Sequence, residues 1–156
     1  MNKNFLAFSL VVLILSACSI STQAAQTPMA EKQASISADA QQSSALAGIL
    51  ESNGFAGRAK CASDCSVYER LSPRMTANIH DNNQLIIQVF KDAGGVLDLQ
   101  VTSLVVAQAY GREFATWITD HSNAAQLEDQ TGLIGSYSIW MRIYEEKGII
   151  NIRHAG

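Results

Sequence analysis

Alternating apolar and polar residues predict two β-hairpins in the second half of the chain. Residues 84–90 (QLIIQVF) form an apolar run typical of a mostly buried strand, and residues 96–102 alternate after a turn that contains two glycines. Residues 136–144 alternate again, and residues 149–153 follow them after a charged turn. We therefore predict that the first two segments pair as one hairpin and that the last two pair as another.

Apolar residues at helical spacing predict two helices. Residues 45–50 form a short amphipathic segment between two serines and an Asn-Gly stop signal. Residues 112–121 repeat aromatic and apolar side chains at intervals of three and four positions, which is typical of one helix face. Residues 104–110 fit either the end of a strand or the start of a helix.

The remaining segments read as connections. Residues 57–83 carry turn signals and predict an irregular region with a short helix near Ser66, and residues 122–135 predict a polar loop. The resulting order is α–β–β–α–β–β. This order predicts an α+β fold, a small antiparallel sheet built from two β-hairpins with helices packed on one face.

The N-terminal residues carry a targeting signal. Lys3 precedes an apolar run over residues 5–15 that fits a signal peptide and is too short to span a bilayer. The sequence Leu15-Ser16-Ala17-Cys18 follows, and it resembles the lipobox of bacterial lipoproteins. The resemblance implies cleavage before Cys18, a diacylglycerol on its sulfur and an acylated N-terminus. These acyl chains together would anchor the protein stably in a membrane, whereas a single acyl chain binds a membrane only marginally. The alternative is an ordinary secreted protein that is cut after Ala24.

The lipobox divides the chain into three parts. We expect a signal peptide over residues 1–17, a lipidated Cys18 with a flexible Ser/Gln/Ala-rich tether over residues 18–44, and a folded domain over residues 45–156. Ser19 stands where Asp would favour retention in the inner membrane. The resemblance therefore implies the outer membrane, with the domain facing the periplasm or displayed at the surface.

Three cysteines leave one pair if Cys18 carries lipid. Cys61 and Cys65 are expected to form a disulfide, because exported proteins meet an oxidising compartment. A redox pair fits less well, since three residues rather than two separate the cysteines. A zinc site would need two further ligands from His80, His121 and His154.

Composition and motifs exclude several function classes. The net charge of −3 lacks the basic excess of a nucleic-acid binder. The sequence contains no nucleophile elbow, phosphate-binding glycine loop, metalloprotease motif or calcium loop. We therefore expect no cofactor, no metal and no nucleic acid.

One feature favours binding of another protein. Trp140 and Tyr144 flank Arg142 on one face of the strand at 136–144, and these residue types are enriched at interface hot spots. The alternative is that a helix covers this face and buries the strand on both sides. A second candidate is the basic stretch formed by Arg58, Lys60, Arg70 and Arg74.

These features lead to a functional hypothesis. We expect a non-enzymatic, lipid-anchored periplasmic accessory or adaptor of an outer-membrane assembly of the secretion, pilus or conjugation type. The partner is another envelope protein. The alternatives are an inhibitor or immunity lipoprotein against an incoming toxin or hydrolase, and a small periplasmic hydrolase in which His80, His121 or His154 converges with an acid.

Overall fold

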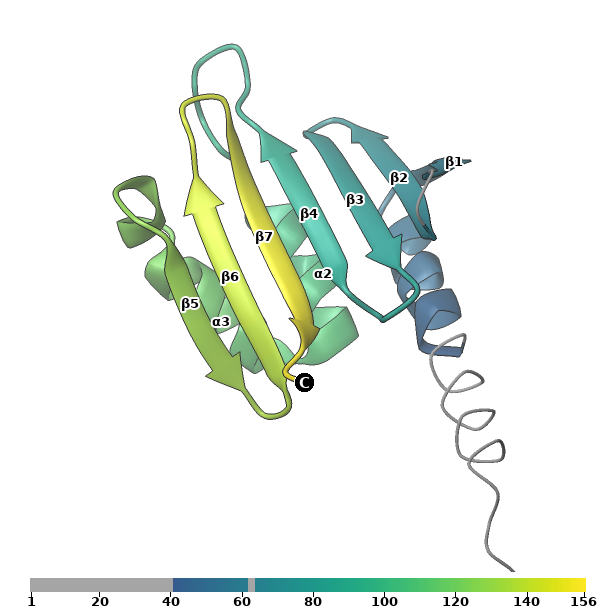
Figure 1. Ribbon diagram of the computed structural model, residues 1–156. Coiled ribbons are helices and arrows are strands. Elements are labelled where there is room, and N and C mark those ends of the chain that lie inside the picture. The colour runs from purple at the N-terminus through teal and green to yellow at the C-terminus, as the bar shows by residue number, and fades with distance from the viewer. Residues whose placement is uncertain (1–40, 62–63) are drawn as a thin grey trace, which may run out of the picture.

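A seven-stranded antiparallel sheet forms the frame of the protein, with its helices against one face (Figure 1). The computed structural model of the chain describes residues 41–61 and 64–156. Within them the strands are β1 (Ala56–Lys60), β2 (Cys65–Leu71), β3 (Arg74–His80), β4 (Leu85–Phe90), β5 (Gln130–Ile134), β6 (Tyr137–Ile143) and β7 (Lys147–His154). Their order across the sheet is β1-β2-β3-β4-β7-β6-β5. The expected α+β class is confirmed.

The helices fill the layer behind the sheet. They are α2 (Gln100–Tyr110), α3 (Arg112–His121), the 3-10 turn η1 (Ala124–Gln126) and a helical segment over residues 41–52. Figure 1 shows α2 and α3 behind the central strands and the segment 41–52 behind the β2 side. No helix among the described residues is long and apolar enough to cross a membrane.

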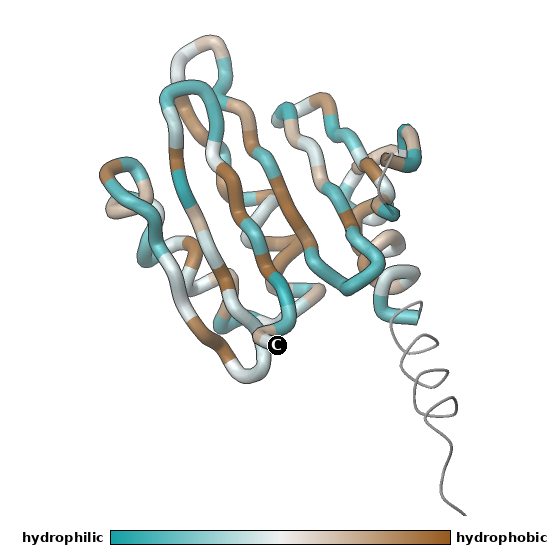
Figure 2. The backbone as a smooth tube through the Cα atoms, viewed as in Figure 1, coloured by the Kyte–Doolittle hydropathy of each residue, from teal (hydrophilic) through white to brown (hydrophobic). Residues whose placement is uncertain are grey.

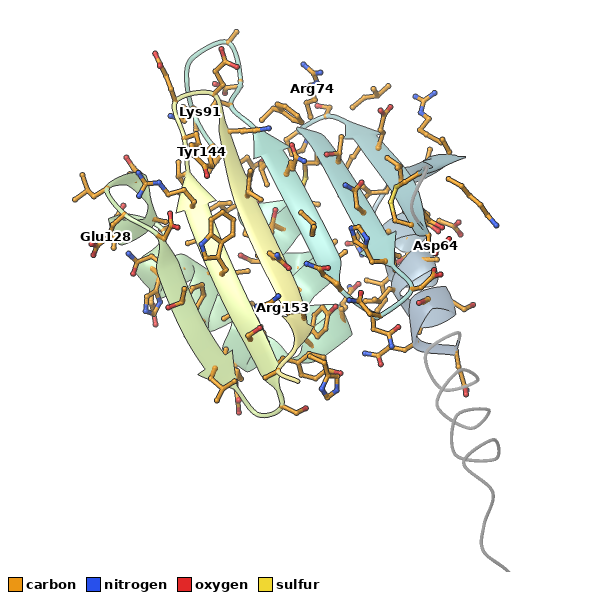
Figure 3. All side chains as sticks on the ribbon, viewed as in Figure 1. Asp64, Arg74, Lys91, Glu128, Tyr144 and Arg153 are labelled. Atoms are coloured by element: carbon orange, nitrogen blue, oxygen red, sulfur yellow. A yellow bond between two sulfur atoms is a disulfide. The ribbon has the colours of Figure 1, made fainter. Side chains whose placement is uncertain are left out.

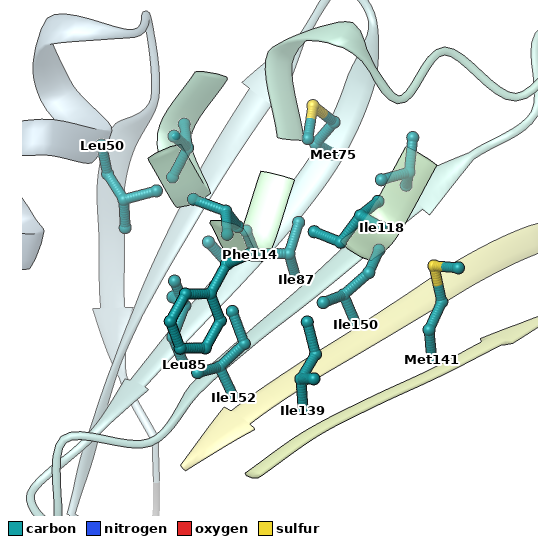
Figure 4. Close-up of a cluster of buried hydrophobic side chains, with 14 of the residues drawn as sticks. Leu50, Met75, Leu85, Ile87, Phe114, Ile118, Ile139, Met141, Ile150 and Ile152 are labelled. Atoms are coloured by element: carbon teal, nitrogen blue, oxygen red, sulfur yellow. The ribbon is translucent and has the colours of Figure 1, made fainter. Parts of the chain in front are cut away.

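The core lies between the sheet and these helices. The central strands turn every second side chain toward the helices and bury it. Apolar residues are therefore frequent along these strands (Figure 2). Figure 4 shows how side chains from strands and helices meet in one cluster. Its largest fully buried members are Leu50, Met75, Leu85, Ile87, Val89, Val105, Val106, Ile118, Ile139, Met141, Ile150 and Ile152.

The second hairpin and both helices are where the sequence predicts them. β6 pairs with β7 in antiparallel register, with Trp140 opposite Asn151. Helix α3 spans the predicted residues 112–121, with Phe114 and Ile118 buried.

The first predicted hairpin is wrong. Residues 84–90 do form a strand, β4, but it pairs with β3 and β7 rather than with residues 96–102. Leu97, Val101 and Val105 lie four positions apart, so the residues that alternate also satisfy helical spacing. Asp98 accepts a hydrogen bond from the backbone N–H of Gln100 (2.9 Å), and α2 begins there. Residues 104–110 are therefore helical.

The irregular reading of residues 57–83 is also wrong, because they form β1, β2 and β3. β3 buries Met75, Ala77 and Ile79, but the small Ala77 and the polar residues between them weaken the apolar pattern. The predicted loop 122–135 likewise contains η1 and the edge strand β5. An edge strand buries little, so its sequence carries little apolar signal.

The boundary of the tether also changes. Residues 41–44, predicted as the end of the tether, are helical. Gln42 Nε2 donates to the Tyr137 hydroxyl (3.0 Å) and Ser43 Oγ donates to Asn83 Oδ1 (3.0 Å), which ties this turn to the domain. The predicted signal peptide, the predicted lipidation site Cys18 and the predicted tether as far as residue 40 lie outside the described residues.

Candidate functional site

One face of the sheet has no helix on it within residues 41–61 and 64–156. We call it the open face and define it by the residues of the four central strands that alternate with the core. They are Arg74, Thr76, Asn78 and His80 from β3; Ile86, Gln88 and Phe90 from β4; Ser138, Trp140 and Arg142 from β6, with Tyr144 beyond its end; and Lys147, Ile149, Asn151 and Arg153 from β7. Figure 3 views the molecule from this side, with helices behind the ribbon.

The open face carries Trp140, Arg142 and Tyr144, which the sequence placed on one side of a strand. No helix of the described residues covers them, because α2, α3 and the segment 41–52 lie on the opposite side of the sheet (Figure 1). Trp140 and Arg142 are half-buried by their strand neighbours, and Tyr144 is 45% exposed. The guanidinium carbon of Arg142 lies 5.9 Å from the centroid of the Tyr144 ring. An aromatic and cationic group is therefore presented to solvent.

A second aromatic and cationic group lies on the same face and was missed by the sequence analysis. The guanidinium carbon of Arg74 lies 4.5 Å from the centroid of the Phe90 ring, and Lys147 Nζ lies 5.9 Å from the same centroid. Lys147 Nζ also donates to Gln88 Oε1 (3.0 Å). The sequence signal for this group is weak, because Gln84 and Gln88 share that face of the strand with the apolar Ile86 and Phe90.

Neutral groups hold most cations of the open face. Arg153 Nε donates to Ser138 Oγ (3.4 Å). Arg74 lies over the Phe90 ring, and Lys147 donates to the side-chain amide of Gln88. The exception is Arg142, whose Nε lies 3.7 Å from Asp129 Oδ1. That pair is loose and Asp129 is exposed, so its attraction is largely screened.

An open depression of about 390 Å³ lies where the open face ends at the β2–β3 turn and the loop after β4. Arg74 and Lys91 line it together with Leu71, which is 78% exposed, and Val96, which is 61% exposed. Figure 3 labels Arg74, Lys91 and Tyr144 toward this same end of the sheet.

The described chain begins at the other end of the sheet. Gln42 and Ser43 contact Tyr137 and Asn83, which lie at the β5–β6 turn and the β3–β4 turn. The C-terminus lies at that end too (Figure 1). The depression therefore points away from the point where residue 41 joins the domain.

The structure separates the basic stretch proposed as the second candidate. Arg58 Nε lies 3.2 Å from Glu69 Oε2. Arg70 Nε donates to the backbone carbonyl of Asn53 (3.0 Å), on the helix side of β2. Lys60 is exposed at the end of β1, and only Arg74 belongs to the open face. This stretch is therefore not one patch.

The three histidines do not meet. His80 lies on the open face at the end of β3. His121 stacks on Trp117 (4.3 Å between centroids), and its Nδ1–H donates to the Trp117 carbonyl (2.8 Å). The ring centroid of His154 lies 4.5 Å from that of Tyr137, on the helix side of the sheet where β6 begins and β7 ends. Each ring thus has a different neighbour, and the described residues contain no group of His, Cys, Asp and Glu suited to a metal ion. The three histidines therefore do not share one site.

Cys61 and Cys65 lie at disulfide distance, with their Cα atoms 5.1 Å apart. They close the β1–β2 turn, where the Cys61 N–H also donates to the Cys65 carbonyl (2.8 Å). Cys65 is buried, and its strand β2 lies next to the edge strand β1. The pair therefore staples one turn at the edge of the sheet, as the short spacing predicts.

The chain was compared with protein-family models, curated proteins and solved structures, and none of them matches it.

Proposed function

We propose that this protein is a lipid-anchored accessory protein of the bacterial outer membrane that binds another envelope protein through the open face. The observation that carries the proposal is the open face itself. It sets Trp140, Phe90 and Tyr144 among four cations on a rigid antiparallel sheet. Such aromatic and Arg clusters supply most of the energy at protein interfaces.

The second support is the lipobox at Leu15–Cys18. A lipid anchor confines a protein to one membrane layer and raises its effective concentration toward partners in that layer. For an accessory role in a membrane assembly, an anchored binding domain is better suited than a freely diffusing one.

Site-specific photocrosslinking in whole cells tests the binding face. A photoreactive amino acid replaces Trp140 in one strain and Thr116 in a matched strain, since Thr116 is exposed on α3 and faces away from the open face. We expect one dominant protein adduct from position 140 and none from position 116. Equal adducts from both positions, or no protein adduct from position 140, would contradict the proposal.

Challenge with toxins or hydrolases separates the adaptor from the inhibitor. An adaptor gives its adduct in unchallenged cells, whereas an inhibitor or immunity protein gives one only when its target arrives. Appearance of the adduct only under challenge would replace the adaptor with that alternative.

The anchor has its own test. Metabolic labelling with palmitate is expected to mark the wild-type chain and not the Cys18→Ala variant. If the unlabelled Cys18→Ala chain gave the same adduct from position 140 in the same amount, anchoring would play no part in binding.

A further inference from the structure

We propose that the depression beside Arg74 and Lys91 receives an acidic side chain of the protein partner, together with an apolar side chain next to it. This inference rests on the proposed function and names the chemistry of the partner, which is an acidic peptide segment rather than a basic or neutral one.

The open face differs in charge from the rest of the chain. The chain as a whole has 14 acidic and 11 basic residues. Its four central strands, however, contain Arg74, Arg142, Lys147 and Arg153 and no Asp or Glu. A positive face on a negative protein attracts an acidic surface and repels a basic one.

Arg74 and its neighbour Lys147 are held in place without being neutralised. Arg74 stacks on Phe90, and Lys147 is fixed by Gln88 and the same ring. Neither Arg74 nor Lys91 forms an ion pair with any described residue. Their charges are therefore available, and the stacked guanidinium loses little side-chain freedom when it binds a carboxylate.

Two carboxylates, Asp92 and Asp98, also line the depression. Asp92 Oδ1 accepts hydrogen bonds from the backbone N–H groups of Gly94 (2.9 Å) and Val96 (2.8 Å). Asp98 Oδ1 accepts one from the N–H of Gln100 (2.9 Å) at the start of α2. These carboxylates keep their charge, but they are held by the loop and the helix start, and neither forms an ion pair with Arg74 or Lys91.

Part of the rim of the depression is apolar. Leu71 and Val96 are mostly exposed beside the cations, although burial of such side chains is favourable. A partner segment with one acidic and one neighbouring apolar residue would satisfy both. The distance of this end from residue 41 favours a protein over the anchoring bilayer as the source of the anion.

Photocrosslinking from position 71 tests the inference in the full lipidated chain. The photoreactive residue replaces Leu71, and adducts are compared between this chain, Arg74→Glu/Lys91→Glu and the control Lys60→Glu/Arg112→Glu. Both control residues are exposed and off the open face, so the net charge changes equally. Thermal unfolding of each variant checks folding, and Arg74→Gln/Lys91→Gln provides a milder change.

We expect the charge reversal to lower the protein adduct at least about tenfold, since that is the range measured for close interfacial charge pairs, and the control pair to leave it within about twofold. The crosslinked partner peptide should contain Asp or Glu next to an apolar residue, and added salt should weaken the adduct. Capture of a protein does not by itself support the inference.

Three outcomes would overturn it. An adduct at position 71 that survives the charge reversal in a folded variant would show that the partner is not held by its acidity. Crosslinking to lipid alone would assign the cations to anionic headgroups. If adducts form from position 140 but none from position 71, the open face binds protein and the depression does not, so the proposed function survives while this inference fails.

Discussion

A Cβ atom on Gly132 would lie only 2.6 Å from Nε1 of Trp117 and 2.9 Å from Cε2 of the same ring. Gly132 belongs to the edge strand β5, and Trp117 belongs to α3. The missing side chain lets the edge strand pass directly against the helix layer. Gly132 is therefore a packing requirement, and its backbone needs no unusual φ angle.

This contact predicts the effect of Gly132→Ala. The added methyl group must displace the indole or Ile139 Cγ2, which lies 3.2 Å from the same point. We expect a loss of about 1–3 kcal/mol in the free energy of unfolding, typical of overpacking. Chemical denaturation followed by tryptophan fluorescence measures it. An unchanged midpoint would mean that α3 moves away from β5 without cost.

Gly48→Ala is expected to have the opposite sign. Gly48 lies inside the helical segment 41–52, and a Cβ there would meet nothing within 4 Å. Alanine is favoured over glycine in a helix interior by about 1 kcal/mol, so stability should rise by about that amount. The same denaturation assay measures both variants, and a loss of stability at position 48 would contradict the helical assignment of this segment.

Thr102→Val is expected to stabilise the protein. Thr102 is fully buried in the first turn of α2, and its Oγ1 has no hydrogen-bond partner among the described residues. Valine keeps the branched shape and removes the desolvated hydroxyl, a group whose burial costs about 1–3 kcal/mol. Thr119→Val serves as control, because the exposed Thr119 hydroxyl donates to the Ala115 carbonyl (3.0 Å). If Thr102→Val lost more stability than Thr119→Val, the prediction would be contradicted.

Tyr110 is expected to make the protein sensitive to alkali. Burial, aided by the neighbouring Tyr137, raises the pKa of the Tyr110 hydroxyl well above its ordinary value of 10.0. Above pH 10 the unfolded chain releases this proton while the folded chain retains it. The free energy of unfolding that the Tyr110 hydroxyl contributes below pH 10 is therefore lost as the pH rises. The loss is about 1.4 kcal/mol per pH unit until the folded-state pKa is reached.

Urea denaturation between pH 8 and 11.5 checks this behaviour in Tyr110→Phe and in a control, Tyr144→Phe, whose ring is exposed. Tyr110→Phe should show a shallower alkaline loss than the wild-type chain. The control should follow the wild type. Identical pH profiles for all three chains would rule out Tyr110 as the source of alkaline sensitivity.

The disulfide is expected to contribute modestly. Closing the short Cys61–Cys65 loop removes unfolded-state entropy equivalent to about 2 kcal/mol. The double variant Cys61→Ala/Cys65→Ala should lose that much and keep its far-ultraviolet circular dichroism, because the pair lies in one turn at the sheet edge. A reductant should lower wild-type stability to the level of the variant and leave the variant unchanged. Loss of the whole fold on reduction would contradict the local role.

Local periodicity was enough to locate several elements. Residues 112–121 repeat at helical spacing, and residues 136–144 alternate next to a tight turn, so each pattern needs only neighbouring residues to be read. The disulfide spacing is local too. By contrast, Leu97, Val101 and Val105 satisfy strand and helix spacing at once, and only the packing of α2 against the sheet separates the two.

The chain's pattern also identified Trp140, Arg142 and Tyr144 as one group, because alternation along a strand places them on one face. It did not reveal which face the helices cover. That depends on which strands pair, and β4 pairs with β3 and with β7, about 60 positions further along the chain. These non-local pairings bring Arg74, Phe90 and Lys147 from three strands to one end of the open face. Residue types and local periodicity can thus be predicted from the sequence. The composition of the candidate site depends on the tertiary structure, because distant segments compete to pair in the sheet over the same core.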